Sequence, residues 1–112
     1  MEAVKELLAR YRRYLLVMDE YAETWDEDRL DLLSPGEAFD ILTIRDRLAE
    51  AYLTPAQQRE LERLDDLLVK YGDVVSGNAP PDIRAPRSRW WWHLEEGSEA
   101  RDDARAERLT TS

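Results

Sequence analysis

The stretch Ser34–Gln57, SPGEAFDILTIRDRLAEAYLTPAQ, carries the same helix-start signal at both of its ends. The signal is SPGE at residues 34–37 and TPAQ at residues 54–57. In each copy the hydroxyl side chain can accept a backbone N–H of the first helical turn, and the Glu or Gln three residues later can bond back to the cap. Proline also suits the first position of a helix, where its missing N–H costs nothing. The stretch therefore predicts one helix over about residues 35–53 and another over about residues 55–71.

Apolar residues upstream of this stretch predict a longer helix over about residues 2–25, because they recur at alternating spacings of four and three. This stripe consists of Val4, Leu8, Tyr11, Leu15, Met18, Ala22 and Trp25, and it is widened by Leu7, Tyr14 and Tyr21. The helix over 35–53 has two adjoining apolar stripes, formed by Ile41, Ile44, Leu48 and Ala51 and by Ala38, Leu42, Ala49 and Tyr52. Two stripes require contact on two sides, so we expect this helix to lie between the other two.

The composition changes near Gly72, where helical periodicity gives way to prolines and glycines. We therefore predict an all-α fold, a small antiparallel three-helix bundle over residues 1–72, with Gly72 as the left-handed cap of its last helix. An extended, Pro-containing C-terminal tail is predicted over residues 73–112, and its final stretch from Gly97 should be solvated because it has almost no apolar face. A bundle of this size is near the lower limit for a self-sufficient core, so we also expect its first helix to be covered by a homodimer contact or by a larger partner.

Three consecutive tryptophans, Trp90, Trp91 and Trp92, are the most unusual feature of the tail. In a helix, Trp90 and Trp91 would share a face with Leu94 while Trp92 points elsewhere, so one body cannot easily cover all three rings. Tryptophan and arginine dominate binding hot spots, and this run is preceded by Arg84, Arg87 and Arg89. We therefore predict that residues 83–94 dock on a protein partner; the alternative is that the run folds back into a groove of the bundle.

The charge balance argues against nucleic acid and membrane as partners. The chain of 112 residues has a formal net charge of -9, and both partners are polyanions or carry anionic surfaces. Seven acids lie close together, opposed only by Arg29: Asp19, Glu20, Glu23, Asp26, Glu27, Asp28 and Asp31. Because the turn glycine of a calcium loop is missing among them, we interpret them as a solvated surface or as one that docks a basic partner.

No pattern in the sequence predicts catalysis, a metal or a cofactor. Cysteine is absent, His93 is the only histidine, and there is no nucleophile-elbow or phosphate-loop motif. The N-terminal residues lack the apolar run of a signal peptide, so we expect a cytoplasmic protein.

These observations predict a non-enzymatic interaction protein. It would act as an adaptor, assembly factor or accessory subunit that docks through its Arg/Trp segment. The alternative is an acidic inhibitor or antitoxin-like protein whose helical body blocks a basic, nucleic-acid-binding surface.

Overall fold

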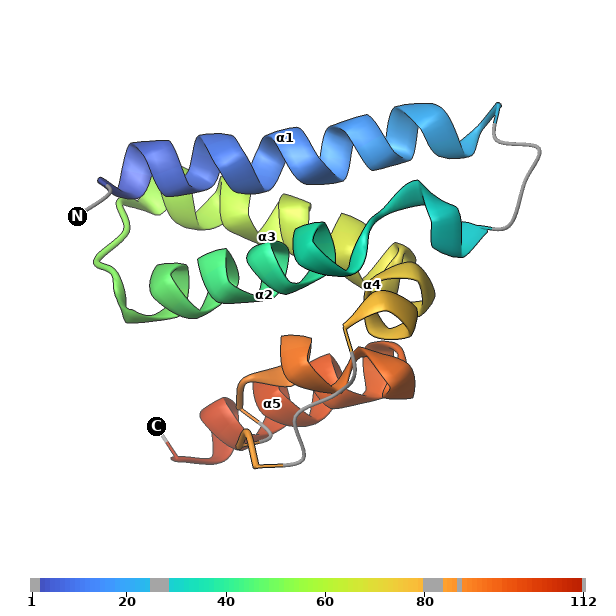
Figure 1. Ribbon diagram of the computed structural model, residues 1–112. Coiled ribbons are helices and arrows are strands. Elements are labelled where there is room, and N and C mark those ends of the chain that lie inside the picture. The colour runs from blue at the N-terminus through green and yellow to red at the C-terminus, as the bar shows by residue number, and fades with distance from the viewer. Residues whose placement is uncertain (1–2, 25–28, 80–83, 87, 112) are drawn as a thin grey trace.

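A computed structural model describes residues 3–24, 29–79, 84–86 and 88–111, and every regular element among them is a helix. The all-α prediction is therefore confirmed for these residues. Figure 1 shows the elements, which are α1 (Val4–Ala22), the 3₁₀-helix η1 (Arg29–Leu32), α2 (Pro35–Glu50), α3 (Pro55–Lys70), α4 (Gly72–Asn78), the 3₁₀-helix η2 (Trp90–Glu96) and α5 (Ser98–Thr111). None of the helices in the described ranges combines the length and apolarity needed to cross a bilayer.

Both predicted helix starts are confirmed. The Ser34 hydroxyl accepts the backbone N–H of Glu37 at 3.2 Å, and the Glu37 carboxylate accepts the backbone N–H of Ser34 at 3.0 Å. Thr54 and Gln57 make the same pair of bonds at the start of α3. This reciprocal pair of bonds, called a capping box, satisfies N–H groups that the first turn of a helix would otherwise leave unpaired. The end of α2 comes earlier than predicted, at Glu50, and leaves Tyr52 outside the helix and fully exposed.

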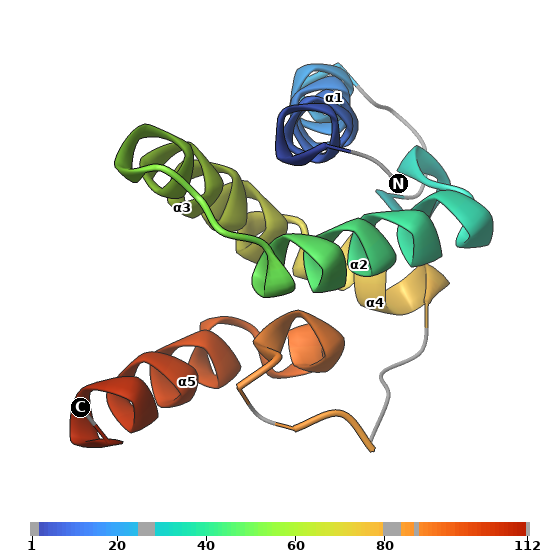
Figure 2. The same ribbon diagram turned by 90° about the vertical axis from the view of Figure 1, so that its left-hand side faces the viewer.

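α1 packs against both α2 and α3 and contributes five buried side chains, Leu7, Leu8, Tyr11, Leu15 and Met18. The predicted stripe is thus correct for its buried members, while Trp25 lies outside the described residues. The expectation that the 35–53 helix occupies the middle is wrong. α2 and α3 diverge beneath α1 (Figure 2), and both of them contact α4 and η2. Of the second stripe of α2, Ala38 and Leu42 are buried, whereas Ala49 and Tyr52 are exposed.

Residues 72–111 differ from the predicted extended tail. The structure folds their described parts into α4, η2 and α5, and buried residues such as Val74, Val75 and Leu94 belong to the same hydrophobic cluster as those of α1 and α2. The expected solvated end also buries part of α5, since Ala100 and Ala104 lie in that cluster. Small side chains four residues apart give little hydrophobic signal in the sequence, yet they let a helix approach its neighbour closely. The two parts of the chain therefore share one core.

Gly72 does not have the left-handed conformation predicted for it. It opens α4, where a Cβ atom would come within 3.3 Å of the backbone oxygen of Leu94 in η2. This glycine therefore allows α4 and η2 to approach more closely than most Cβ atoms would permit. Among the described residues only Gly97, between η2 and α5, has a positive φ, with φ 67° and ψ -140°.

Gly97→Ala is expected to lower the free energy of unfolding by about 1–3 kcal/mol, the typical cost of holding a side chain in such a conformation. No atom lies within 4 Å of the added Cβ, so the loss would come from the backbone alone. Urea denaturation measures it. Gly36→Ala is the matched control, because Gly36 is an exposed helical residue whose added Cβ meets only the Ser34 hydroxyl at 4.0 Å. Equal stabilities for the two variants would contradict this prediction.

Candidate functional site

The centre of the molecule contains a buried ion pair between α2 and α3. Arg45 donates from Nε to one carboxylate oxygen of Asp65 at 2.9 Å and from Nη2 to the other at 3.1 Å. The hydroxyl of Tyr11 on α1 donates to Asp65 at 2.7 Å. All three residues are buried, and burial together with the neighbouring Asp65 carboxylate raises the pKa of Tyr11 well above its usual value. This triad therefore connects the three long helices through one carboxylate.

The tryptophan run covers the open side of this triad. The Arg45 guanidinium lies 4.2 Å from the centre of the Trp91 ring, and its Nη1 atom is buried with no hydrogen-bond partner among the described residues. Trp90 packs edge to face on Trp91, with 5.7 Å between ring centres and 84° between ring planes. A cation held against an aromatic face in a dry site is stabilised by the ring quadrupole, so the rings compensate in part for the buried charge.

α5 contributes a second arginine to the same cluster. Arg101 is buried, lies 5.5 Å from the Trp90 ring centre and donates to Asp66 of α3 at 2.6 Å. It also donates to the backbone oxygen of Glu62 at 3.3 Å. Trp90 therefore lies between the arginines of α2 and α5, and Arg101 ties α5 to α3.

Asp46, the residue after Arg45, holds the run from its outer side. One oxygen of its carboxylate accepts Trp91 Nε1 at 2.8 Å, Trp92 Nε1 at 2.9 Å and Arg89 Nη1 at 2.9 Å. Arg89 also bonds Glu50 at 3.0 Å, and its two carboxylate partners raise its pKa. A single side chain of α2 thus fixes three residues of the predicted docking segment.

Asp46→Ala is expected to lower the free energy of unfolding by about 2–3 kcal/mol, because the loss of one ionised acceptor leaves two indole N–H groups and Arg89 without it. Asp46→Asn keeps an acceptor oxygen, so its free energy of unfolding should fall by less. Thermal unfolding compared with Asp102→Ala, a change at an exposed acid of α5, measures the effect. A stability equal to that of the control would show that the carboxylate does not hold the run.

The backbone of η2 explains how three consecutive rings find places. A 3₁₀-helix has about three residues per turn, so successive side chains point about 120° apart. Trp90 and Trp91 are directed into the core, and Trp92 is left half-buried, where its ring meets Phe39 of α2 edge to face at 6.1 Å. The helical spacing predicted this division of the three rings. Leu94 is buried as well, although the backbone leaves helical geometry at His93, between it and the rings.

The predicted arginines occupy different surroundings. Arg89 is half-buried in its two ion pairs, Arg84 is exposed, and Arg87 lies outside the described residues. A partner could reach Trp90, Trp91 and Leu94 only if η2 came away from α2 and α3. The face that is open to contact consists of Trp92 and its ring neighbour Phe39.

The predicted acidic group is only partly assembled. Glu20, Glu23 and Asp31 are exposed, whereas Asp26, Glu27 and Asp28 lie outside the described residues. Asp19 accepts hydrogen bonds from Tyr71 and from Lys70, the latter at 3.1 Å, and these bonds lower its pKa. Asp19 therefore ties α1 to the end of α3.

His93 is buried beside the run, and its Nε2 lies 3.0 Å from the backbone oxygen of Ala85. Because a carbonyl only accepts, Nε2 carries the proton. His93, Glu95 and Glu96 offer ligand atoms within 4.8 Å of one another, the only such group among the described residues. This bond gives His93 a structural role, because it connects η2 to the segment that precedes it.

Four charged residues of this site were missed in the sequence: Arg45, Asp65, Asp46 and Arg101. A signal for the first two exists, since Arg45 follows Ile41 by four positions and precedes Leu48 by three. Asp65 has the same relation to Leu61 and Leu68. Opposite charges placed on the apolar stripes of two neighbouring helices predict a buried pair. Asp46 has no such signal, because its partners are more than forty residues away in sequence.

Comparison with protein-family models, with curated proteins and with solved structures gives no match in any of the three.

Proposed function

We propose that this protein is a non-enzymatic interaction module that binds a protein partner through the outward part of its tryptophan segment. The observation that carries the proposal is a partly exposed aromatic pair, formed by the half-buried Trp92 of η2 and the exposed Phe39 of α2. Phe39 is 58% exposed although it packs against a tryptophan. Aromatic side chains supply large contact areas at low entropic cost, and this makes them frequent anchors of protein interfaces.

The surroundings of the aromatic pair suit an anchor. Trp92 is fixed by its bond to Asp46, so little rotamer freedom would be lost on binding. Asp46 and Asp40 are half-buried acids on α2, and the whole chain has a formal net charge of -9. The partner that fits is a protein with an apolar recess and a basic rim. Binding a partner of this kind would be the role of an adaptor or of an accessory subunit in a larger complex.

The test compares Phe39→Ala with Tyr52→Ala. Both remove an exposed aromatic ring, but Tyr52 is 99% exposed after the end of α2 and makes no aromatic pair among the described residues. Tagged wild-type and variant proteins are used for quantitative affinity capture from cells that produce the protein. We expect one protein to be retained by the wild type and by Tyr52→Ala and to be depleted with Phe39→Ala.

The affinity of that protein is then measured directly. Loss of an anchor ring typically costs about 2 kcal/mol of binding, or about thirtyfold in Kd. Thermal unfolding of Phe39→Ala should stay close to that of the wild type because the ring is exposed. Identical capture profiles for the two variants would exclude the aromatic pair as the docking site.

A second candidate function is that of an acidic inhibitor or antitoxin-like protein that blocks a basic, nucleic-acid-binding surface. It is favoured by Glu20 and Glu23, which are exposed at the C-terminal end of α1, together with Asp31 of η1. Here Glu20→Gln/Glu23→Gln should weaken capture of a basic protein, with a strong dependence on salt, while Phe39→Ala leaves it unchanged. The opposite ranking of the two variants would support the aromatic anchor.

A further inference from the structure

The outer face of α1 has two adjacent aliphatic side chains in the middle of the helix. Leu16 is 48% exposed and Val17 is 44% exposed, while their neighbours Leu15 and Met18 are buried. α2 and α3 lie on the opposite side of α1, and α5 lies farther away still (Figure 2). Elements in the described ranges therefore leave about half of each of these two side chains open, with Val17 at the edge of a groove between α1, η1 and the start of α2.

Charges of opposite sign flank the aliphatic centre. Arg13 lies three residues before Leu16, and Glu20 lies three residues after Val17. Because residues three, four and seven apart share one side of a helix, all four form a single stripe. Arg13 and Glu20 are exposed, and neither has an ion-pair partner among the described residues. Nearby charges differ in this respect, since Arg12 pairs with Glu60 and Arg10 with Asp40.

We propose that this stripe binds a second copy of the same chain, with the two α1 helices antiparallel about a two-fold axis between Leu16 and Val17. Arg13 and Glu20 are equally distant from that axis, so Arg13 of each copy comes opposite Glu20 of the other. The same symmetry places the exposed aliphatic side chains of the two copies against each other. A parallel arrangement would instead place Arg13 beside Arg13 and Glu20 beside Glu20. The order of charges thus selects the antiparallel pair.

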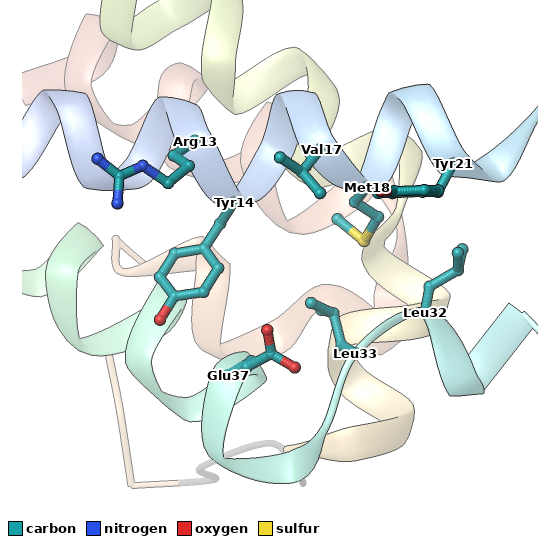
Figure 3. Close-up of a pocket in the computed structure, with 8 residues that line it drawn as sticks. All are labelled: Arg13, Tyr14, Val17, Met18, Tyr21, Leu32, Leu33 and Glu37. Atoms are coloured by element: carbon teal, nitrogen blue, oxygen red, sulfur yellow. The ribbon is translucent and has the colours of Figure 1, made fainter.

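A groove beside the stripe supports the same arrangement. It has a volume of about 370 Å³ and lies between α1, η1 and the start of α2, as Figure 3 shows. Arg13, Val17 and Tyr21 line it from α1, and Leu32, Leu33 and Glu37 lie across from them. In the antiparallel pair, Tyr21 of the second copy comes level with Arg12 and Arg13, at the N-terminal end of this groove. The groove therefore offers an apolar surface for a side chain of the second copy.

The contact of one helix with another is small compared with a standard protein interface, and exposed ion pairs contribute little each. We therefore expect a weak dimer that forms at high micromolar concentration. Sedimentation equilibrium of the full chain should show the mean mass rising from the monomer mass of 13.2 kDa toward twice that value as concentration increases.

Two charge-reversal variants test the arrangement. Arg13→Glu places two acids opposite each other at both contacts, and Glu20→Arg does the same with two arginines, so each variant alone should dimerise about tenfold more weakly. An equimolar mixture of the two variants restores opposite charges at both contacts, and the mean mass should recover. Circular dichroism should be unchanged, because both positions are exposed.

Phe39→Ala serves as the matched control, since it changes an exposed ring of α2 outside the proposed contact. It should leave the dimer intact, so failure of this inference and failure of the aromatic anchor can be told apart. A wild-type protein that stays monomeric at millimolar concentration would overturn the proposal. So would a mixture of the two charge-reversal variants that remains as weak as each variant alone.

Discussion

Asp65→Ala is expected to lower the free energy of unfolding by about 3–5 kcal/mol, the usual cost of leaving one partner of a buried ion pair without the other. Arg45 would remain buried with its two bonds lost, and the Tyr11 hydroxyl would lose its acceptor. Small domains are stable by only about 5–15 kcal/mol, so this change removes a large share of the total. Urea denaturation followed by circular dichroism at 222 nm measures the effect.

A double variant separates the charge from the packing. Arg45→Met/Asp65→Leu removes both charges and keeps apolar volume, and such replacements are often neutral or stabilising in other proteins. It should therefore recover most of the stability that Asp65→Ala loses. Asp102→Ala, at an exposed acid of α5, is the control for loss of a negative charge. If Asp65→Ala were no less stable than this control, the triad would not hold the three helices together.

Trp91→Ala is expected to lower the free energy of unfolding by about 3–5 kcal/mol, the range for large aromatic side chains removed from a core. The substitution removes a buried ring, its bond to Asp46 and the aromatic face over Arg45. Chemical denaturation of the full-length variant and of the wild type measures this loss of stability. Trp92→Ala is the comparison within the run, and it should cost less because that ring is only half-buried.

The same pair of variants decides between folding back and docking for the first two rings. If Trp91→Ala changed stability by less than about 0.5 kcal/mol, as surface substitutions do, the ring would be free to serve a partner. A large loss for Trp91→Ala with a small one for Trp92→Ala would leave Trp92 as the ring available for binding. Far-UV circular dichroism of both variants confirms that the comparison is made between folded proteins.

Local chemistry made the helix boundaries predictable. A capping box is complete within four residues, so Ser34 with Glu37 and Thr54 with Gln57 determine where α2 and α3 begin in any tertiary context. The apolar stripe of α1 was equally readable because its period is that of the helix itself. The division of the run into two inward rings and one outward ring also followed from side-chain directions along a short segment.

The C-terminal third could not be predicted in this way. Its helices bury Ala100, Ala104 and two tryptophans, and none of these residues forms an apolar stripe of normal strength. α5 is positioned by Arg101, which bonds Asp66 and the backbone of Glu62 on α3. Such bonds join residues that are far apart in the chain, so the spacing of residues along the sequence does not predict them. An arginine-rich, proline-broken stretch consequently resembled a tail.

The sequence by itself therefore determined the helical class of the described residues, the starts of α2 and α3, and a tryptophan run that cannot turn all its rings to one side. Tertiary structure decided what those rings are for within the molecule. Arg45 and Asp65 had to meet before there was a buried charge for Trp91 to cover, and the tryptophan run had to come beside Asp46 before that carboxylate could hold it. The physical reason is that a buried charge is costly until its partners arrive from other helices, so its position is a property of the assembled core.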